Sequence, residues 1–216
     1  MKDATHIAVL LDRSGSMESI KAETISGFNF FLNEQKKSGA NAGLTLVQFD
    51  TQATEVVHEN RPIQSVPELT AETYQPRGGT PLLDALGETI ISTGRTLEVI
   101  AEMNRPDKVV FVIITDGQEN SSHKFNKAQV KEMVEHQTNV YKWQFIYLGA
   151  NQDAFAEAGN MGIAVGQAAN FTPANLPAAF AVATENVAAF RRSNDVASLR
   201  YSDEQRQRMT KDNKGE

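Results

Sequence analysis

The stretch Ile7-Ala8-Val9-Leu10-Leu11-Asp12-Arg13-Ser14-Gly15-Ser16-Met17 determines how the rest of the chain is interpreted. Its first half is an apolar run without alternation, which is typical of a strand buried on both faces of a sheet. The run stops at an aspartate that is followed by serines and a glycine. From Met17 to Lys37 apolar residues recur at helical spacing, and Gly39 stands where a helix C-cap is expected. The order strand, loop, helix favours a parallel α/β sheet.

A second apolar run, Lys108 to Thr115, is the most hydrophobic strand candidate in the chain, and it also ends in an aspartate, Asp116. Between these runs, residues 44–49 and 54–58 have the composition of two short strands. They are too close together for a helical crossover, so we expect an antiparallel hairpin. One strand of that hairpin would lie at the edge of the sheet.

The remaining segments continue the alternation of helices and strands. We expect the following order: a surface connection over 59–79, a helix that begins at Pro81, a helix over 127–137 with Asn126 and Gln129 placed like a capping box, a strand over 140–148, a short helix over 153–158, a short strand over 163–165 and a helix over 176–191.

Together these elements predict a doubly wound α/β fold of the Rossmann-like type. The sheet would be mostly parallel, with one antiparallel edge strand and helices on both faces. A length of 216 residues suits one domain. We assign residues 1–195 to that domain and residues 196–216 to a polar C-terminal tail that we expect to be disordered. In such sheets ligands bind at the carboxyl ends of the strands.

Composition excludes several classes of function. The formal net charge is −6 and the pI is near 5.3, which argues against nucleic acid as a partner. The absence of cysteine rules out disulfides, thiolate catalysis and cysteine-based metal sites. The apolar run at residues 7–11 is too short for a signal-peptide core, and no segment approaches the roughly 20 apolar residues of a membrane span. We therefore expect a soluble cytoplasmic protein without a membrane partner; its oligomeric state is not specified by the sequence.

The aspartates that end the two apolar runs, Asp12 and Asp116, should emerge on the same edge of the sheet. Two anions at one place require a compensating cation. Ser14 and Ser16 put two hydroxyls into the loop that follows Asp12. A site made of oxygen atoms alone suits a hard cation, Mg²⁺ above all, with Mn²⁺ and Ca²⁺ as alternatives.

Three segments carry a resemblance to a known family. Residues 12–17, Asp-Arg-Ser-Gly-Ser-Met, resemble the Asp-x-Ser-x-Ser signature of von Willebrand factor A domains. Residues 78–82, Gly-Gly-Thr-Pro-Leu, resemble the loop that provides the ligating threonine of that family, and residues 115–117, Thr-Asp-Gly, resemble its third loop. The resemblance covers about residues 5–190 and is to domains of the bacterial or phage type.

The resemblance implies a metal-ion-dependent adhesion site. Its metal ligands would be Asp12, Ser14, Ser16, Thr80 and Asp116, with the serines and the threonine bound directly and the aspartates through water. One coordination position would stay open for an acidic residue of a partner protein. Arg13, Gly79 and Glu119 would then line the rim to which the partner binds.

Each part of this pattern also has an ordinary structural explanation. Ser16 could be a helix N-cap, Thr80 could be an N-cap with Pro81 as the first helical residue, and Asp116 could simply begin a turn. Only the combination of all three segments, in order, favours the metal site.

The leading functional hypothesis is a metal-dependent protein-binding module that is not an enzyme. The first alternative is a metal-dependent phosphoryl-transfer or hydrolytic enzyme with Asp12 as nucleophile. Against it stand the absence of a P-loop, of a Gly-x-Ser-x-Gly elbow, and of a second carboxylate two residues after Asp12. The second alternative is an adaptor subunit of an ATP-driven, stress or defence complex.

Overall fold

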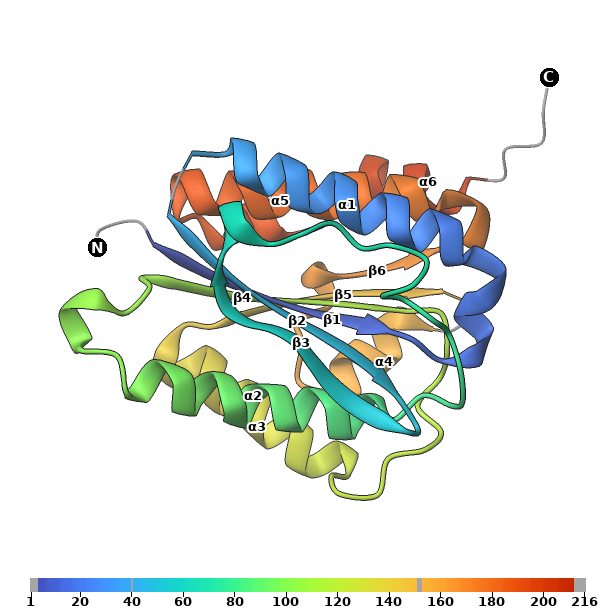
Figure 1. Ribbon diagram of the computed structural model, residues 1–216, viewed down its shortest axis with the longest axis horizontal. Coiled ribbons are helices and arrows are strands. Elements are labelled where there is room, and N and C mark those ends of the chain that lie inside the picture. The colour runs from blue at the N-terminus through green and yellow to red at the C-terminus, as the bar shows by residue number, and fades with distance from the viewer. Residues whose placement is uncertain (1–3, 40, 151–152, 212–216) are drawn as a thin grey trace.

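The computed structural model describes residues 4–39, 41–150 and 153–211. Within these residues the strands form one sheet in the order β3-β2-β1-β4-β5-β6 (Figure 1). The strands are β1 (Thr5–Asp12), β2 (Ala42–Asp50), β3 (Ala53–Pro62), β4 (Lys108–Thr115), β5 (Gln144–Ala150) and β6 (Ala168–Phe171). All neighbours pair in parallel except β2 and β3, so the predicted sheet with its antiparallel edge strand is confirmed.

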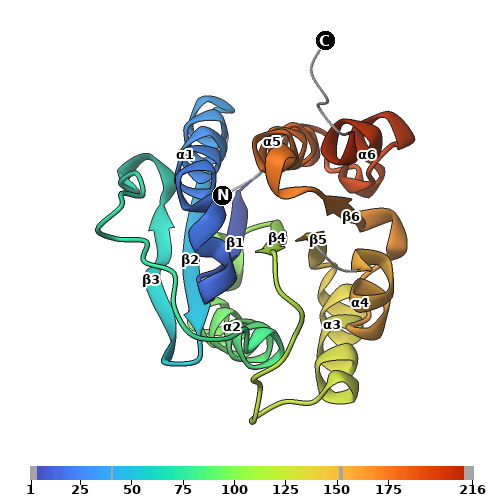
Figure 2. The same cartoon turned by 90° about the vertical axis from the view of Figure 1, so that its right-hand side faces the viewer.

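Helices cover both faces of the sheet, as expected. One layer contains α1, α5 and α6, and the other contains α2, α3 and α4 (Figure 2). The helices are α1 (Lys21–Lys37), α2 (Leu82–Glu98), α3 (Lys127–Tyr141), α4 (Ala154–Asn160), α5 (Leu176–Ser193) and α6 (Asp203–Thr210), and a 3₁₀ turn, Gly15–Ile20, precedes α1. No helix in the described part of the chain is both long and apolar enough to cross a bilayer.

Strand β1 lies at the centre of the sheet, which explains why its residues 7–11 are all apolar. Ile7, Val9 and Leu11 pack in the core beneath α1 and α5, while Ala8 and Leu10 pack in the core beneath α2 and α3. A strand that is buried on both faces shows no alternation of polar and apolar residues.

The order of the strands reverses between β1 and β4. From β1 the chain proceeds outward through β2 and β3, and from β4 it proceeds in the other direction through β5 and β6. The loops that follow β1 and β4 therefore lead to opposite sides of the sheet, which leaves a crevice at the carboxyl ends of these two strands.

Two predicted boundaries around β5 and β6 are wrong. Residues 140 and 141 belong to the last turn of α3, whose left-handed C-cap is Lys142, so the strand begins only at Gln144. Tyr141 is β-prone and stands beside apolar residues, which made this helix end resemble a strand. The final strand is not at 163–165 but at Ala168–Phe171, where it pairs in parallel with β5.

The connection predicted to lie on the surface is instead partly buried. Strand β3 extends to Pro62, and the following strap, which we define as residues 63–77, buries Ile63, Val66, Leu69 and Tyr74 in the core beneath α1. The side chain of Asn29 accepts from the amide of Leu69 at 2.7 Å and donates to its carbonyl at 2.9 Å. The apolar residues of the strap are spaced irregularly, so no periodicity marks them as buried.

The expectation of a disordered tail from residue 196 is wrong for residues 196–211. A 3₁₀ turn, Val196–Leu199, leads into α6, which begins with a capping box formed by Ser202 and Gln205. Leu199, Tyr201 and Met209 are buried, and the amide of Thr172 donates to the carbonyl of Met209 at 3.0 Å. Only a few apolar residues are needed to dock so short a segment, so its composition stays polar. Residues 212–216 of the predicted tail lie outside the described residues.

Because the Met209 side chain is fully buried, we expect Met209→Ala to lower the free energy of unfolding by about 2–5 kcal/mol. Arg208→Ala in the same helix removes a side chain that is 46% exposed and should change stability by no more than about 0.5 kcal/mol. Urea unfolding of the two variants measures the difference. Equal stabilities would mean that α6 does not dock on the domain.

Candidate metal centre

Three loops meet at the crevice between the ends of β1 and β4. We call them loop 1 (residues 12–16, after β1), loop 2 (residues 78–80, before α2) and loop 3 (residues 115–117, after β4). Figure 2 faces this edge of the sheet. Backbone hydrogen bonds join loop 1 to loop 2: the amide of Gly15 donates to the carbonyl of Gly78 at 2.9 Å. The three segments that resemble the adhesion-site signature are therefore neighbours in space.

The carboxylate of Asp12 links the ends of the two central strands. One oxygen, Oδ1, accepts a hydrogen bond from the amide of Ser14 at 2.7 Å, and the other, Oδ2, accepts one from the hydroxyl of Thr115 at 2.5 Å. Asp12 is completely buried. Its position is thus fixed by loop 1 and loop 3 together.

The hydroxyls of loop 1 point toward the second aspartate. The Oγ atoms of Ser14 and Ser16 lie 3.0 Å apart, and the hydroxyl of Ser16 donates to Oδ1 of Asp116 at 2.5 Å. Ser14 and Asp116 are buried, whereas Ser16 is exposed. The cluster of oxygen atoms therefore opens to solvent at Ser16.

Thr80 completes the predicted set from the side of loop 2. The residue is 2% exposed, and within the described part of the chain no hydrogen bond involves its side chain. Gly117 lies directly against it, because a Cβ atom added to this glycine would come within 2.6 Å of Thr80 Oγ1. The backbone of Thr80 is held by Asn120, whose Oδ1 accepts a hydrogen bond from the Thr80 amide at 2.9 Å. The hydroxyl therefore lies beside Gly117, the residue after Asp116, and has no hydrogen-bond partner among the described residues.

The ordinary explanations of these hydroxyls as helix caps do not hold. Neither the 3₁₀ turn after Ser14 nor α2 has a side-chain hydrogen bond at its N-cap residue, and the N-cap of α2 is Pro81 rather than Thr80. The first amides of α2 are bound by the loop after β4 instead: Leu83 donates to Glu119 Oε2 at 2.9 Å and Asp84 donates to Ser122 Oγ at 3.0 Å.

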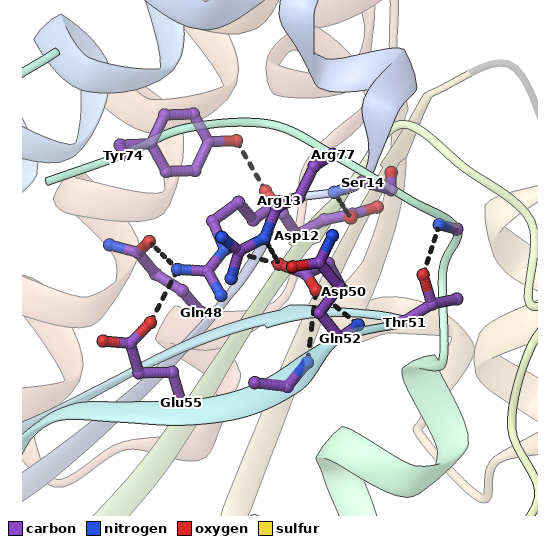
Figure 3. A network of polar contacts seen from close by, with 12 residues as sticks. Asp12, Arg13, Ser14, Gln48, Asp50, Thr51, Gln52, Glu55, Tyr74 and Arg77 are labelled. Carbon is purple, nitrogen blue, oxygen red and sulfur yellow. Dashed lines mark hydrogen bonds and ion pairs between the residues drawn. The ribbon is translucent and has the colours of Figure 1, made fainter. Parts of the chain in front are cut away.

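Two of the three residues predicted to line the partner-binding rim have other roles. The side chain of Arg13 is buried and points away from the oxygen cluster, toward Asp50 (Figure 3). Both carboxylate oxygens of Glu119 are taken, by Leu83, Ser121 and Ser122. A long side chain following a loop aspartate looks accessible in sequence, but here the polar ends of both residues bind inside the domain. Gly79 is half-buried at the edge, where a Cβ atom would come within 2.5 Å of Ser121 Oγ.

The electrostatics of the site disfavour two free carboxylates. Burial raises the pKa of Asp12 to about 6, although the hydrogen bonds from Thr115 and Ser14 act in the opposite direction. Burial also raises the pKa of Asp116, against the effect of the Ser16 hydrogen bond. Removing charged groups from water costs free energy unless an opposite charge is near. A cation at this place would offset that cost.

The donor set fits a hard divalent cation. It consists of hydroxyls from Ser14, Ser16 and Thr80 and carboxylates from Asp12 and Asp116. The sequence has no cysteine, and the described residues contain no group of three or more His, Cys, Asp and Glu side chains that could hold a metal. A metal here would consequently depend on hydroxyl oxygens, which suit Mg²⁺ and Mn²⁺ better than soft ions.

Several residues around the site were missed by the sequence reasoning. Thr115 binds Asp12, and Asn120 holds Thr80 in place. Asp50, which accepts from Arg13 and Arg77, ends β2 just as Asp12 ends β1. That position at a strand end was a signal that could have identified Asp50. No sequence signal marks Tyr74, whose hydroxyl donates to the carbonyl of Asp12 at 2.5 Å.

No protein-family model and no curated protein matches the sequence. Solved structures with a similar fold include proximal thread matrix protein 1 from the mussel byssus, with a TM-score of 0.60 and 14% identity, covering 84% of this chain and 47% of that one. A von Willebrand factor type A protein from Catenulispora acidiphila has a TM-score of 0.53 and 14% identity over 84% of this chain and 42% of that one. The ArnB paralog VWA2 from Sulfolobus acidocaldarius has a TM-score of 0.50 and 16% identity, over 82% of this chain and 44% of that one.

A further structure of the mussel protein, described as having a zinc occupied MIDAS motif, matches with a TM-score of 0.58 and 15% identity, covering 84% of this chain and 47% of that one. The chain spans less than half the length of these solved structures. At such identities the likeness concerns the fold. The chain has the fold of von Willebrand factor A domains.

The raised pKa of Asp12 predicts how the stability of the metal-free protein depends on pH. The folded-state pKa of about 6 lies above the ordinary value of 3.8, so the stability that Asp12 contributes is complete below about pH 4 and is lost as the pH rises through about 6. In metal-free buffer, the free energy of unfolding of the wild type should fall relative to Asp12→Asn by on the order of 3 kcal/mol between these limits. Urea unfolding at a series of pH values tests this, and a difference that stays flat or grows with pH would contradict it.

Proposed function

We propose that this chain is a metal-dependent protein-binding module. A divalent cation, held by Asp12, Ser14, Ser16, Thr80 and Asp116, binds an acidic residue of a partner protein. The observation that carries the proposal is the convergence of five oxygen-bearing side chains from three loops, with Ser16 bonded to Asp116 at 2.5 Å and Thr80 left without a side-chain partner in the described part of the chain. The fold shared with the zinc-occupied mussel protein supports it.

The chemistry of the donor set suggests why a partner carboxylate would bind. The directly bound ligands would be the neutral hydroxyls, with the aspartates bound through water, so an anionic ligand is favoured at an open coordination position of the cation. The residues of this chain hold the hydroxyls in place, bury both aspartates and leave the side of Ser16 accessible. Mg²⁺ is the ion we propose, with Mn²⁺ and Ca²⁺ as alternatives.

An enzymatic role for Asp12 is less well supported than binding. A nucleophilic carboxylate must reach its substrate, whereas Asp12 is completely buried and both of its oxygens accept hydrogen bonds. We therefore propose that the protein is not an enzyme. Service as an adaptor subunit of an ATP-driven, stress or defence complex is compatible with the binding role, and no observation in the structure favours it specifically.

The partner we propose is a protein with an accessible aspartate or glutamate. The net charge of −6 continues to argue against nucleic acid. A cytoplasmic location is proposed on the sequence reasoning alone. A pull-down in Mg²⁺ compared with the same experiment in EDTA would identify the partner.

Metal binding should raise the melting temperature. If Mg²⁺ binds only the folded protein, a hundredfold excess over its Kd adds about 2.7 kcal/mol, which for a chain of this size corresponds to an increase on the order of 5–10 °C. Asp116→Asn removes one of the two buried charges, so its metal-free form should melt at or above the metal-free wild type and gain much less from Mg²⁺. Equal gains for both proteins in a thermal scan would place the ion elsewhere.

The hydroxyl of Thr80 is predicted to be a direct ligand. Thr80→Val keeps the shape of the side chain and removes only the oxygen, so Mg²⁺ affinity measured by calorimetric titration should fall at least about tenfold. Capture of the partner in Mg²⁺ should be lost with it.

Thr89→Val is the matched control, because Thr89 is a buried threonine of α2, the helix that follows loop 2, and within the described residues its hydroxyl bonds only to the carbonyl of Ala85. This variant should bind Mg²⁺ like the wild type.

Stoichiometric Zn²⁺ binding without any response to Mg²⁺ would refute the choice of ion, and an unchanged affinity in Thr80→Val would refute the role of the threonine.

A further inference from the structure

Loop 2 does not continue from a strand of the sheet; its amide at Gly79 donates to the hydroxyl of Thr51 in the turn between β2 and β3 at 3.2 Å. It follows the strap, which has no regular secondary structure after the 3₁₀ turn Ile63–Ser65. Loop 1, in contrast, continues directly from β1. Asn120 and Thr51 hold loop 2 from other sides, and its position relative to the serines depends in addition on contacts with loop 1.

Two backbone hydrogen bonds connect loop 1 with loop 2 and with the last residue of the strap. The amide of Gly15 donates to the carbonyl of Gly78 at 2.9 Å, and the amide of Arg77 donates to the carbonyl of Arg13 at 2.8 Å. Both bonds lie within three residues of proposed ligands. Contacts that hold Arg13 close to Arg77 therefore help to place Ser14 and Ser16 relative to Thr80.

Asp50 makes this connection through side chains. Its Oδ2 atom accepts from Nε of Arg13 at 2.8 Å and from Nε of Arg77 at 2.9 Å, so one carboxylate oxygen joins loop 1 to the last residue of the strap, which leads into loop 2 (Figure 3). Its Oδ1 atom accepts from the amides of Gln52 and Ala53 in the turn between β2 and β3. The aspartate is thereby anchored to the rigid sheet. We call Arg13, Asp50 and Arg77 the arginine brace.

The charges of the brace are maintained. Burial acts to raise the pKa of Asp50, but the hydrogen bonds from Gln52, Arg77 and Arg13 outweigh it and lower the pKa below its ordinary value. Arg13 has a second acidic partner, because its Nη1 donates to Glu55 at 2.7 Å and to Gln48 at 3.1 Å. Arg13 and Arg77 thus face the carboxylates of Asp50 and Glu55, so these four side chains together carry no net charge.

Stability alone is a poor explanation for the brace. The Nη2 atom of Arg13 is buried without a hydrogen-bond partner among the described residues, and an unsatisfied buried donor is costly. Buried ion pairs in general stabilise little compared with well-packed apolar groups, whereas their directional bonds fix geometry. An arrangement that retains this cost at the edge of the candidate metal centre points to a positioning role.

We infer that the arginine brace sets the position of loop 2 relative to loop 1 and thereby determines the affinity of the metal site, although none of its side chains touches the ion. This inference rests on the proposed function, since it concerns the same site. It assigns Arg13, Asp50 and Arg77 as positioning residues.

The decisive variant is Arg77→Met, because the Arg77 side chain is 41% exposed and its removal leaves the buried Arg13–Asp50 pair intact. Two explanations predict opposite changes in the Mg²⁺ affinity of this variant. Through-space electrostatics alone would tighten Mg²⁺ binding when a nearby positive charge is removed. Loss of positioning should weaken it, and we expect the Kd from calorimetric titration to rise about 10-fold to 100-fold, as for other residues that orient metal ligands.

Hydrogen exchange in metal-free buffer supplies a readout that does not depend on the ion. In Arg77→Met the amide of Gly15, which bonds loop 2, should exchange at least about tenfold faster than in the wild type. The amide of Val112 in the centre of β4 should be unchanged, which shows that the fold is intact. Arg95→Met, the same substitution at an exposed arginine near the far end of α2, should alter neither the exchange nor the Kd.

The outcomes separate this inference from the proposed function. If wild type binds Mg²⁺ and Arg77→Met binds it equally well or more tightly, or if the exchange of the Gly15 amide is unchanged, the positioning role is refuted and the metal site stands. If wild type binds no Mg²⁺, Mn²⁺ or Ca²⁺, the proposed function fails, and faster exchange at Gly15 would then leave the brace as a link between two loops without a metal to serve.

Discussion

The candidate metal centre depends on two carboxylates that are buried at the ends of adjacent parallel strands. Asp12 and Asp116 follow β1 and β4, the pair at which the order of the strands reverses. The reversal opens a crevice in a sheet that is otherwise covered on both faces, and the chain fills the edge of this crevice with hydroxyls and amides rather than apolar groups. The surrounding features are consistent with the need to hold these two carboxylates near neutral donors. They include Gly117 beside Thr80 and the side chains that bind the first amides of α2.

The polar side chains near the crevice divide into two groups with distinct tasks. Glu119, Asn120 and Ser122 saturate backbone amides at the start of α2 and around Thr80. Because these groups bind the orphan amides that the N-terminus of α2 presents, the Thr80 hydroxyl of loop 2 is not needed as a cap. It is therefore left for the candidate metal.

Much of the fold could be predicted because its signals are local. The apolar run of β4 matches the structure residue for residue, and the capping box at Asn126 marks the start of α3. The strap, β6 and α6 were not predicted, because each is held by a few contacts with residues distant in sequence, such as Asn29 with Leu69 and Thr172 with Met209. The same reason explains the site: the five candidate ligands follow from strand ends and signature residues, and Asp50 also stands at a strand end, whereas no spacing encodes the side-chain geometry through which Arg77 binds it.

The separation of the site residues along the chain has a consequence for the order of events in folding. The bond between Ser16 and Asp116 joins residues 100 positions apart, and that between Asp12 and Thr115 joins residues 103 apart. Contacts between residues so far apart in sequence form slowly, because the entropy of the intervening chain must be lost before the contacts contribute any stability. A metal that needs both aspartates cannot act as a nucleus for folding, as zinc does in a zinc finger. It would associate only with molecules whose central strands are already paired, so that loading with metal would distinguish finished protein from chains still being assembled.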